Sequence, residues 1–182
     1  MFPPLQWWEF SKFCKVATSK ELQAMAKDKN QNILDLIATD HRKVEQIFSQ
    51  IESASNLEQL YRYFNQLYKE VNLHARAEEL VFYPGLREYE DTDAMIAEAE
   101  SEHEEAATLL EEIKALSPDS AEFKEKIAEL KKAILHHVQE EESEIFETAR
   151  DGMNEQQLKQ LGQEFQEAKT KLEDEVVEAA SL

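Results

Sequence analysis

Apolar residues recur at alternating spacings of three and four along four successive segments of this 182-residue chain. An amphipathic α-helix keeps a single apolar stripe on one face with this period. The pattern therefore predicts four helices, each with one buried seam. The seam positions are Leu34, Ile37, His41, Val44, Phe48 and Ile51 in the first segment; Leu57, Leu60, Phe64, Leu67, Val71, His74, Glu78 and Val81 in the second; Ile96, Ala99, His103, Ala106, Leu110 and Ile113 in the third; and Phe123, Ile127, Leu130, Ile134, His137 and Glu141 in the fourth.

Turn and capping residues separate the segments where the seams end. Asn56 suits the N-cap of the second helix, and the sequence Tyr-Pro-Gly at 83–85 suits its end. Residues 117–120, Ser-Pro-Asp-Ser, form a turn, and Gly152 stops the fourth helix. Short connections require antiparallel neighbours, so we predict an all-α, up-down-up-down antiparallel four-helix bundle over residues 31–151.

Further segments flank the predicted bundle on both sides. Residues 152–182 carry a fifth apolar stripe and are expected to form an additional C-terminal helix packed on the bundle. Residues 1–30 form an aromatic N-terminal extension in which Trp7, Phe10 and Cys14 follow a helical spacing. This extension is interpreted first as a leader packed on the main domain, and contact of residues 1–17 with a protein partner or a membrane surface is the alternative.

Composition narrows the classes of function. The chain has 20 basic and 39 acidic residues, a formal net charge of −19, which disfavours binding to the phosphate backbone of nucleic acids. A single cysteine, Cys14, rules out an intrachain disulfide and a cluster of thiolate ligands. No run of 18 apolar residues marks a transmembrane span. We therefore expect a cytoplasmic protein without a transmembrane segment and without a nucleic-acid partner.

Histidines and glutamates interrupt the apolar seams at regular places. Four of the five histidines lie on a seam, one in each predicted helix, and chance alone would place them there in roughly 2–3% of cases, since a seam takes about two positions in seven. Glu78 and Glu141 each follow a seam histidine by four residues, one turn along the same face. Buried carboxylates need cations or hydrogen-bond partners. Imidazoles and carboxylates suit Fe, Mn or Zn, whereas a purely structural histidine–glutamate core leaves the placement of one histidine per helix unexplained.

The order of these residues repeats along the chain. Asp40-His41 precedes His74-x-x-x-Glu78 in the same way that Glu102-His103 precedes His137-x-x-x-Glu141. The repeat indicates a duplicated helical hairpin with a pseudo-twofold axis through the site. Such symmetry predicts two equivalent metal positions, one between His41 and His74 and one between His103 and His137. The two glutamates would bridge them.

The pattern DHRKVEQIF…HARAEELVFYPGL…EHEEAATLL…HHVQEEESEIF resembles the hemerythrin-like, HHE cation-binding family over about residues 31–151. The resemblance implies a four-helix bundle with a non-haem centre of two Fe ions, bridged by carboxylates and an oxo or hydroxo group. The ligands that it implies are His41, His74, Glu78, His103, His137 and Glu141.

Two departures separate this chain from the oxygen-carrying hemerythrins. Ala107 stands where those proteins have a second histidine in the third helix, and Glu141 follows its histidine by four residues where they use an aspartate at five. Glu45 and Glu100, near seam histidines, could complete the coordination or lie on a solvated face. A ferritin-like centre is disfavoured, because it needs two Glu-x-x-His motifs and this chain has one, at residues 100–103.

These features favour a protein that binds or senses O₂, or iron or NO, at a centre of four histidines and two glutamates. The expected partner is O₂ or another small diatomic ligand. A di-iron oxidoreductase acting on peroxide, NO or ferrous iron is the alternative, and a metal-free adaptor bundle is a third reading.

Overall fold

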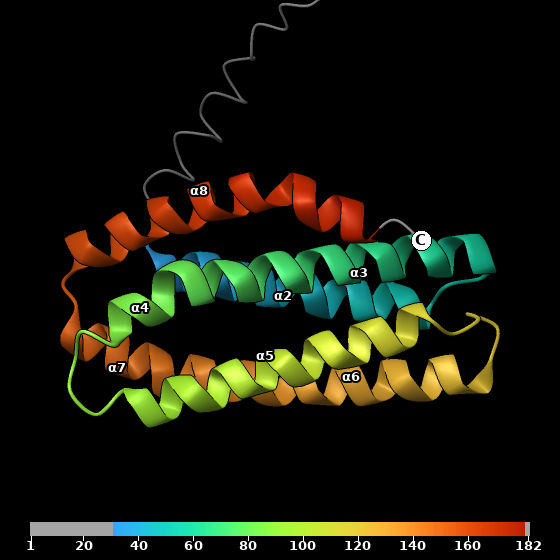
Figure 1. Cartoon of the computed structure of the whole chain (residues 1–182), viewed down its shortest axis with the longest axis horizontal. Coiled ribbons are helices and arrows are strands. Elements are labelled where there is room, and N and C mark those ends of the chain that lie inside the picture. The colour runs from blue at the N-terminus through green and yellow to red at the C-terminus, as the bar shows by residue number, and fades with distance from the viewer. Residues whose placement is uncertain (1–30, 181–182) are drawn as a thin grey trace, which may run out of the picture. The chain divides into compact units, whose positions relative to one another are not determined.

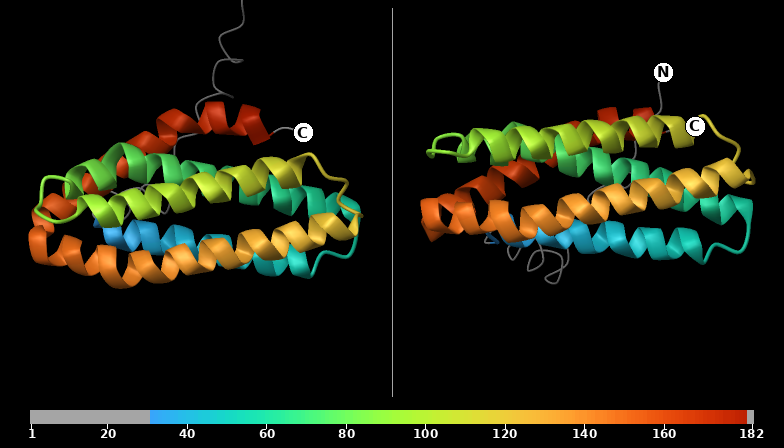
Figure 2. Two further views of the ribbon diagram at one scale, coloured as in Figure 1. Left: turned by 60° about the horizontal axis from the view of Figure 1, so that its bottom comes forward. Right: turned by 90° about the horizontal axis from the view of Figure 1, so that it is seen from below.

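The computed structural model describes residues 31–180, and every regular element in that range is helical (Figure 1). Four long helices run side by side: α2 (Ile33–Glu52), α3 (Leu57–Ala77), α5 (Asp93–Lys114) and α6 (Ala121–Glu140). The pairs α2–α3 and α5–α6 are antiparallel hairpins that lie against each other (Figures 1 and 2). The predicted up-down-up-down four-helix bundle is confirmed.

The second and fourth helices each continue through a π-helical segment. Glu78–Phe82 (η2) leads from α3 into α4 (Tyr83–Leu86), and Glu141–Ile145 (η3) leads from α6 into α7 (Phe146–Gly152). A π-turn adds one residue to the helical repeat and so shifts the buried face by one position. Phe82 is therefore fully buried, while Val81, the predicted seam residue, is partly buried and packs against the core.

Side-chain caps fix where three of the long helices begin. Asn56 Oδ1 accepts a hydrogen bond of 2.9 Å from the backbone N–H of Gln59, as the sequence predicts. Asn32 and Ser120 cap α2 and α6 in the same way. These caps satisfy N–H groups that a helix leaves free at its first turn, and they set the register in which the seams face each other.

The core consists of two apolar clusters at opposite ends of the bundle. One contains Phe48, Phe64 and Phe123, and the other contains Phe82, Phe146 and Phe165. The seam histidines lie between them; His41, for example, is one turn from Ile37 of one cluster and close to Val44 of the other. Side-chain packing from both sides therefore keeps a polar site dry in the middle of the bundle.

A further helix, α8 (Glu155–Ala180), packs on α2 and α3 (Figure 1). Its Phe165 belongs to the core, and its Leu172 and Val176 form a separate apolar cluster with Leu73. None of the described helices combines the length and hydropathy of a bilayer-spanning segment. The predicted N-terminal extension, with its expected partner or membrane contact, lies outside the described residues.

Candidate metal centre

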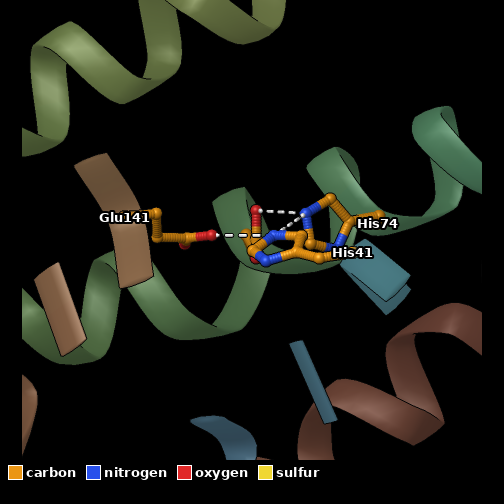
Figure 3. Close-up of side chains that lie close together, drawn as sticks. His41, His74 and Glu141 are labelled. Carbon is orange, nitrogen blue, oxygen red and sulfur yellow. Dashed lines mark hydrogen bonds and ion pairs between the residues drawn. The ribbon is translucent and has the colours of Figure 1, made fainter. Parts of the chain in front are cut away.

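Four histidine side chains meet in the middle of the bundle, one from each long helix. His41 Nε2 lies 3.2 Å from His74 Nε2, and His103 Nε2 lies 3.2 Å from His137 Nε2. Figure 3 shows His41 and His74 turned toward each other, with Glu141 reaching toward them. The structure therefore brings together the histidine pairs that the repeat predicts.

The two seam glutamates complete the cluster. Glu78 Oε2 lies 3.3 Å from His74 Nε2 and 3.4 Å from His103 Nε2, so it lies between the two histidine pairs. Glu141 Oε2 lies 3.1 Å from His41 Nε2 and 3.8 Å from His137 Nε2. Both glutamates are fully buried. Each carboxylate thus faces one histidine of either pair, which is the arrangement that a bridging ligand requires.

Several features of the donor atoms fit metal ions. Neighbouring ligands at about 2.0–2.2 Å from one ion lie about 3.0–3.5 Å apart, close to the separations within each group. Glu78 Oε1 and both carboxylate oxygens of Glu141 are buried without a hydrogen-bond partner of good geometry. Unpartnered buried carboxylate oxygens are costly, and cations would satisfy them. The six residues fit two cations, and their assignment as ligands stays a prediction.

A carboxylate faces the outer ring nitrogen of every histidine in the cluster. Glu142 lies 2.8 Å from His41 Nδ1, Glu79 lies 3.0 Å from His103 Nδ1, and Glu102 lies 2.9 Å from His137 Nδ1. Asp40 Oδ2 is within 3.6 Å of His74 Nδ1. Such partners orient the imidazoles of metal sites and increase their basicity.

These contacts determine where the imidazole protons lie. Where a carboxylate accepts from Nδ1, that nitrogen carries the proton and the Nε2 of a neutral ring presents a lone pair. His103 and His137 would then oppose two lone pairs across 3.2 Å, which is repulsive. A proton or a metal cation between the rings removes the repulsion. A positive charge between the two Nε2 atoms therefore stabilises this arrangement.

Charge in the metal-free site is shared unequally among the buried groups. Burial and the neighbouring Glu141 carboxylate raise the pKa of Glu78 well above its ordinary value. Burial opposes protonation of His41, but Glu141 outweighs it and raises the pKa of His41 to about 9. Burial lowers the pKa of His74 to about 4. Burial opposes ionisation of Glu141, but its contact with His41 outweighs burial and lowers the pKa of Glu141 to about 2. Without a cation, the protons of this group therefore lie on Glu78 and His41, and Glu141 is ionised.

Tyr83 breaks the symmetry of the centre. Its hydroxyl lies 3.5 Å from Glu78 Oε2 and 3.5 Å from His103 Nε2, and its ring stacks on His103. The equivalent residue in the second repeat is Phe146, which has no hydroxyl. One of the two proposed metal positions therefore has a phenol beside it, and the other does not.

A small cavity adjoins the histidines on the side of the apolar cluster that contains Phe48. Its volume is about 30 Å³, larger than the roughly 10–15 Å³ that one water molecule needs. Ala106 lines it, whereas Ala107 is exposed. The apolar side chains that line this cavity are Val44, Val71, Ala75, Ala106, Ala133, Ile134 and Val138.

Other polar residues named by the sequence lie outside the cluster. Glu45 pairs with Arg42 at 2.6 Å and Glu100 pairs with Arg87 at 2.7 Å, both on the surface. His136 is 63% exposed, as its rotation from His137 predicts. The seam pattern by itself does not identify Glu142, which contacts His41. The signal was the repeat itself, because Glu79 and Glu142 each follow a seam glutamate directly.

Comparison with known proteins defines the class to which this bundle belongs. A family profile described as the hemerythrin HHE cation binding domain matches residues 32–149. The chain belongs to this family. The crystal structure of a hemerythrin HHE cation binding domain-containing protein from Mycobacterium kansasii has the same fold, with a TM-score of 0.71 and 20% identity over 80% of this chain and 89% of that one.

Two relatives in sequence extend the comparison. A protein from Nostoc sp. named DNA nickase is 37% identical over 145 residues, which are 79% of this chain and 41% of that protein. An uncharacterized hemerythrin-like protein from Schizosaccharomyces pombe is 26% identical over 143 residues, which are 78% of this chain and 70% of that protein. The chain therefore spans less than half the length of the Nostoc protein. Its membership of the family identifies it as a cation-binding helical protein.

Proposed function

We propose that this chain is a non-haem di-iron protein that binds or senses O₂, or NO or iron itself, at its centre of four histidines and two glutamates. The observation that carries the proposal is the opposition of paired Nε2 atoms at 3.2 Å, with a carboxylate behind each ring. That arrangement leaves two positions at which a cation relieves repulsion between donors. Imidazole and carboxylate ligands together suit iron.

The residues divide into two sets around the proposed ions. His41 and His74 would hold one cation and His103 and His137 the other, while Glu78 and Glu141 would bridge them. When bound, ferrous iron supplies electrons and an open position for a small ligand. The carboxylates at Nδ1 hold each ring in the tautomer that presents Nε2 to the metal.

The adjoining cavity supports a small apolar ligand. Its volume of about 30 Å³ suits a diatomic molecule. Apart from the four histidines and Glu102, its walls are valine, alanine and isoleucine, which offer no hydrogen bond to water. The apolar clusters on either side of the site along the bundle limit proton delivery from solvent through the two ends of the bundle. Val44, Val71 and Ile134 would therefore exclude water while they leave room for O₂ or NO.

Tyr83 favours a second candidate, an oxidoreductase acting on peroxide, NO or ferrous iron. Its hydroxyl is the one phenol in contact with the cluster among the described residues, at 3.5 Å from Glu78 and from His103. A phenol at that distance can donate a hydrogen bond to the Glu78 carboxylate. Turnover that is lost in Tyr83→Phe, with the bound iron unchanged, would favour this candidate over reversible binding.

The name of the Nostoc relative does not extend the proposal to nucleic acids. This chain matches 41% of that protein, so the nicking activity in its name can belong to the remainder. The chain's net charge of −19 opposes binding to a polyanion.

Anaerobic loading with Fe²⁺ tests the proposal. We expect two irons per chain and a visible absorption band that forms in O₂ and disappears under argon. His137→Ala should lose iron, whereas its exposed neighbour provides a matched control in His136→Ala, which should retain it. A wild-type chain that binds no iron, or an equal loss in both variants, would contradict the proposal.

A further inference from the structure

A second pocket opens beside the centre, between α5, α6 and η3. Its volume is about 20 Å³, enough for one water molecule or a cation. Its polar groups are five carboxylates and a single histidine. No lysine or arginine among the described residues lines it. The polar residues that line it are Glu98, Glu102, His137, Glu140, Glu141 and Glu144.

The inner end of this acidic pocket reaches the proposed metal centre. Glu141 lines the pocket, is fully buried, and has both carboxylate oxygens without a hydrogen-bond partner of good geometry. His137, which lines it too, is a proposed ligand of one ion. A buried anionic side chain at the bottom of an acidic pocket, with only histidines near it and no hydrogen bond of good geometry, points to a cation as the species that the pocket receives.

The outer end carries a group of potential ligands at the surface. His136 Nε2 lies 3.4 Å from Glu140 Oε1 and 3.8 Å from Glu102 Oε1. The other oxygen of Glu102 accepts from His137 Nδ1 at 2.9 Å. Glu102 therefore connects an exposed histidine, which can meet a cation from solvent, with a histidine of the buried cluster.

In the first repeat, mostly apolar residues occupy the positions that line this pocket in the second. The repeat places Leu73 at the position of His136, Ala77 at that of Glu140, Val81 at that of Glu144 and Leu36 at that of Glu98. Leu73 is buried against Leu172 and Val176 of α8. Asp40, at the position of Glu102, pairs with Lys169 of α8. The first hairpin therefore has mostly apolar residues and α8 where the second hairpin has the acidic pocket. Figure 2 (right) shows α5 and α6 in front, on the side away from α8.

We propose that this pocket is the entrance through which divalent cations reach the buried centre. The inference rests on the proposed metal-binding function. A hydrated cation would first meet His136, Glu102 and Glu140, and the pocket carboxylates would replace its water molecules as it moves inward to Glu141. Negative charges clustered in a concave site raise the local concentration of cations and their rate of association. The closed face under α8 offers no such route.

Uptake kinetics test the entrance directly. The metal-free full-length chain is mixed with Co²⁺, whose absorption bands report coordination without oxidation by O₂. The variant Glu98→Gln/Glu140→Gln/Glu144→Gln removes three pocket charges without changing a proposed ligand. The control Glu105→Gln/Glu125→Gln/Glu147→Gln removes three exposed charges outside the pocket. We expect the pocket variant to take up Co²⁺ about tenfold or more slowly than the control.

The final amount of Co²⁺ and the order of the rates distinguish the outcomes. The proposal expects all three proteins to reach the same bound Co²⁺, with removal by a chelator also slowed in the pocket variant. Equal uptake rates in the pocket variant and the control would overturn the entrance and leave the proposed centre intact. Absence of Co²⁺ uptake by the wild-type chain would instead overturn the metal centre, and the entrance with it.

Discussion

The orientation of each histidine depends on the acidic residue behind it. Glu79 lies 3.0 Å from His103 Nδ1, Glu142 2.8 Å from His41 Nδ1 and Glu102 2.9 Å from His137 Nδ1. These carboxylates stand next to the seam, at positions that are exposed or half-buried. These carboxylates would not bind a metal ion themselves. They would instead set the affinity of the imidazoles for the ion.

Substitution of Glu79 tests this role. Glu79→Gln keeps the size of the side chain but removes the charge that faces His103 Nδ1. Loss of such a partner typically lowers metal affinity about 10–100-fold. Competition with a chromophoric chelator measures the affinity, and Glu104→Gln, an exposed glutamate next to His103, serves as the control. Equal affinities of the two variants would show that the contact does not tune the site.

The pKa of His41 predicts how metal binding depends on pH. Its value of about 9 in the metal-free protein lies above the unfolded value of about 6.5, so protonated His41 stabilises the metal-free fold below pH 6.5 and this contribution is lost as the pH rises through 9. A cation must displace that proton. Cation affinity should therefore rise between pH 6.5 and 9, and calorimetry in buffers of different ionisation enthalpy should show proton release at pH 7. No proton release would contradict the assignment.

At the scale of elements, the sequence predicts the helices better than their irregularities. The spacing of Leu34, Ile37, Val44 and Phe48 is sufficient to predict α2, because burial of one stripe determines it. The π-helical segments η2 and η3 were not predictable, because a π-turn depends on tertiary packing and has no local residue signature. Their common start at Glu78 and Glu141 places an irregular turn at each proposed bridging carboxylate.

Attachment of α8 to the bundle gives a prediction at this scale. A Cβ atom on Gly162 would lie 2.6 Å from the backbone oxygen of Gln31, so Gly162→Ala must displace α8 from the start of α2. The clash should outweigh the helix-propensity gain of about 1 kcal/mol and cost about 1–3 kcal/mol in total. Thermal unfolding should show Tm lower by several degrees. The exposed position 160 of the same helix provides the control Gln160→Ala, which should leave Tm unchanged or slightly higher.

At the scale of the whole molecule, the two helical hairpins repeat the same pattern of histidines and glutamates but differ in their surroundings. The two repeats contribute equivalent histidines and glutamates, so the position of the centre could be predicted from their spacing. The differences could not: α8 covers the first hairpin, and the second presents an acidic pocket. Which face an additional helix covers depends on surface complementarity between distant segments, for which the seam pattern carries no information.

Cation binding should stabilise the entire bundle, because the proposed histidine ligands come from all four long helices. A ligand that binds only the folded state adds about 2.7 kcal/mol at a concentration 100 times its dissociation constant. Addition of Zn²⁺ or Fe²⁺ to the metal-free chain should therefore raise Tm. The variant His103→Ala, which removes a proposed ligand, should show a smaller rise, and an equal rise would place the stabilising site elsewhere.

The central claim is that two ions lie between the four histidines. Diffraction from crystals loaded anaerobically with Fe²⁺, recorded at the iron absorption edge, locates iron directly. We expect two anomalous peaks per chain, one between His41 and His74 and one between His103 and His137, both adjacent to Glu78 and Glu141. No peak in the bundle core, or iron only on the acidic surface, would contradict it.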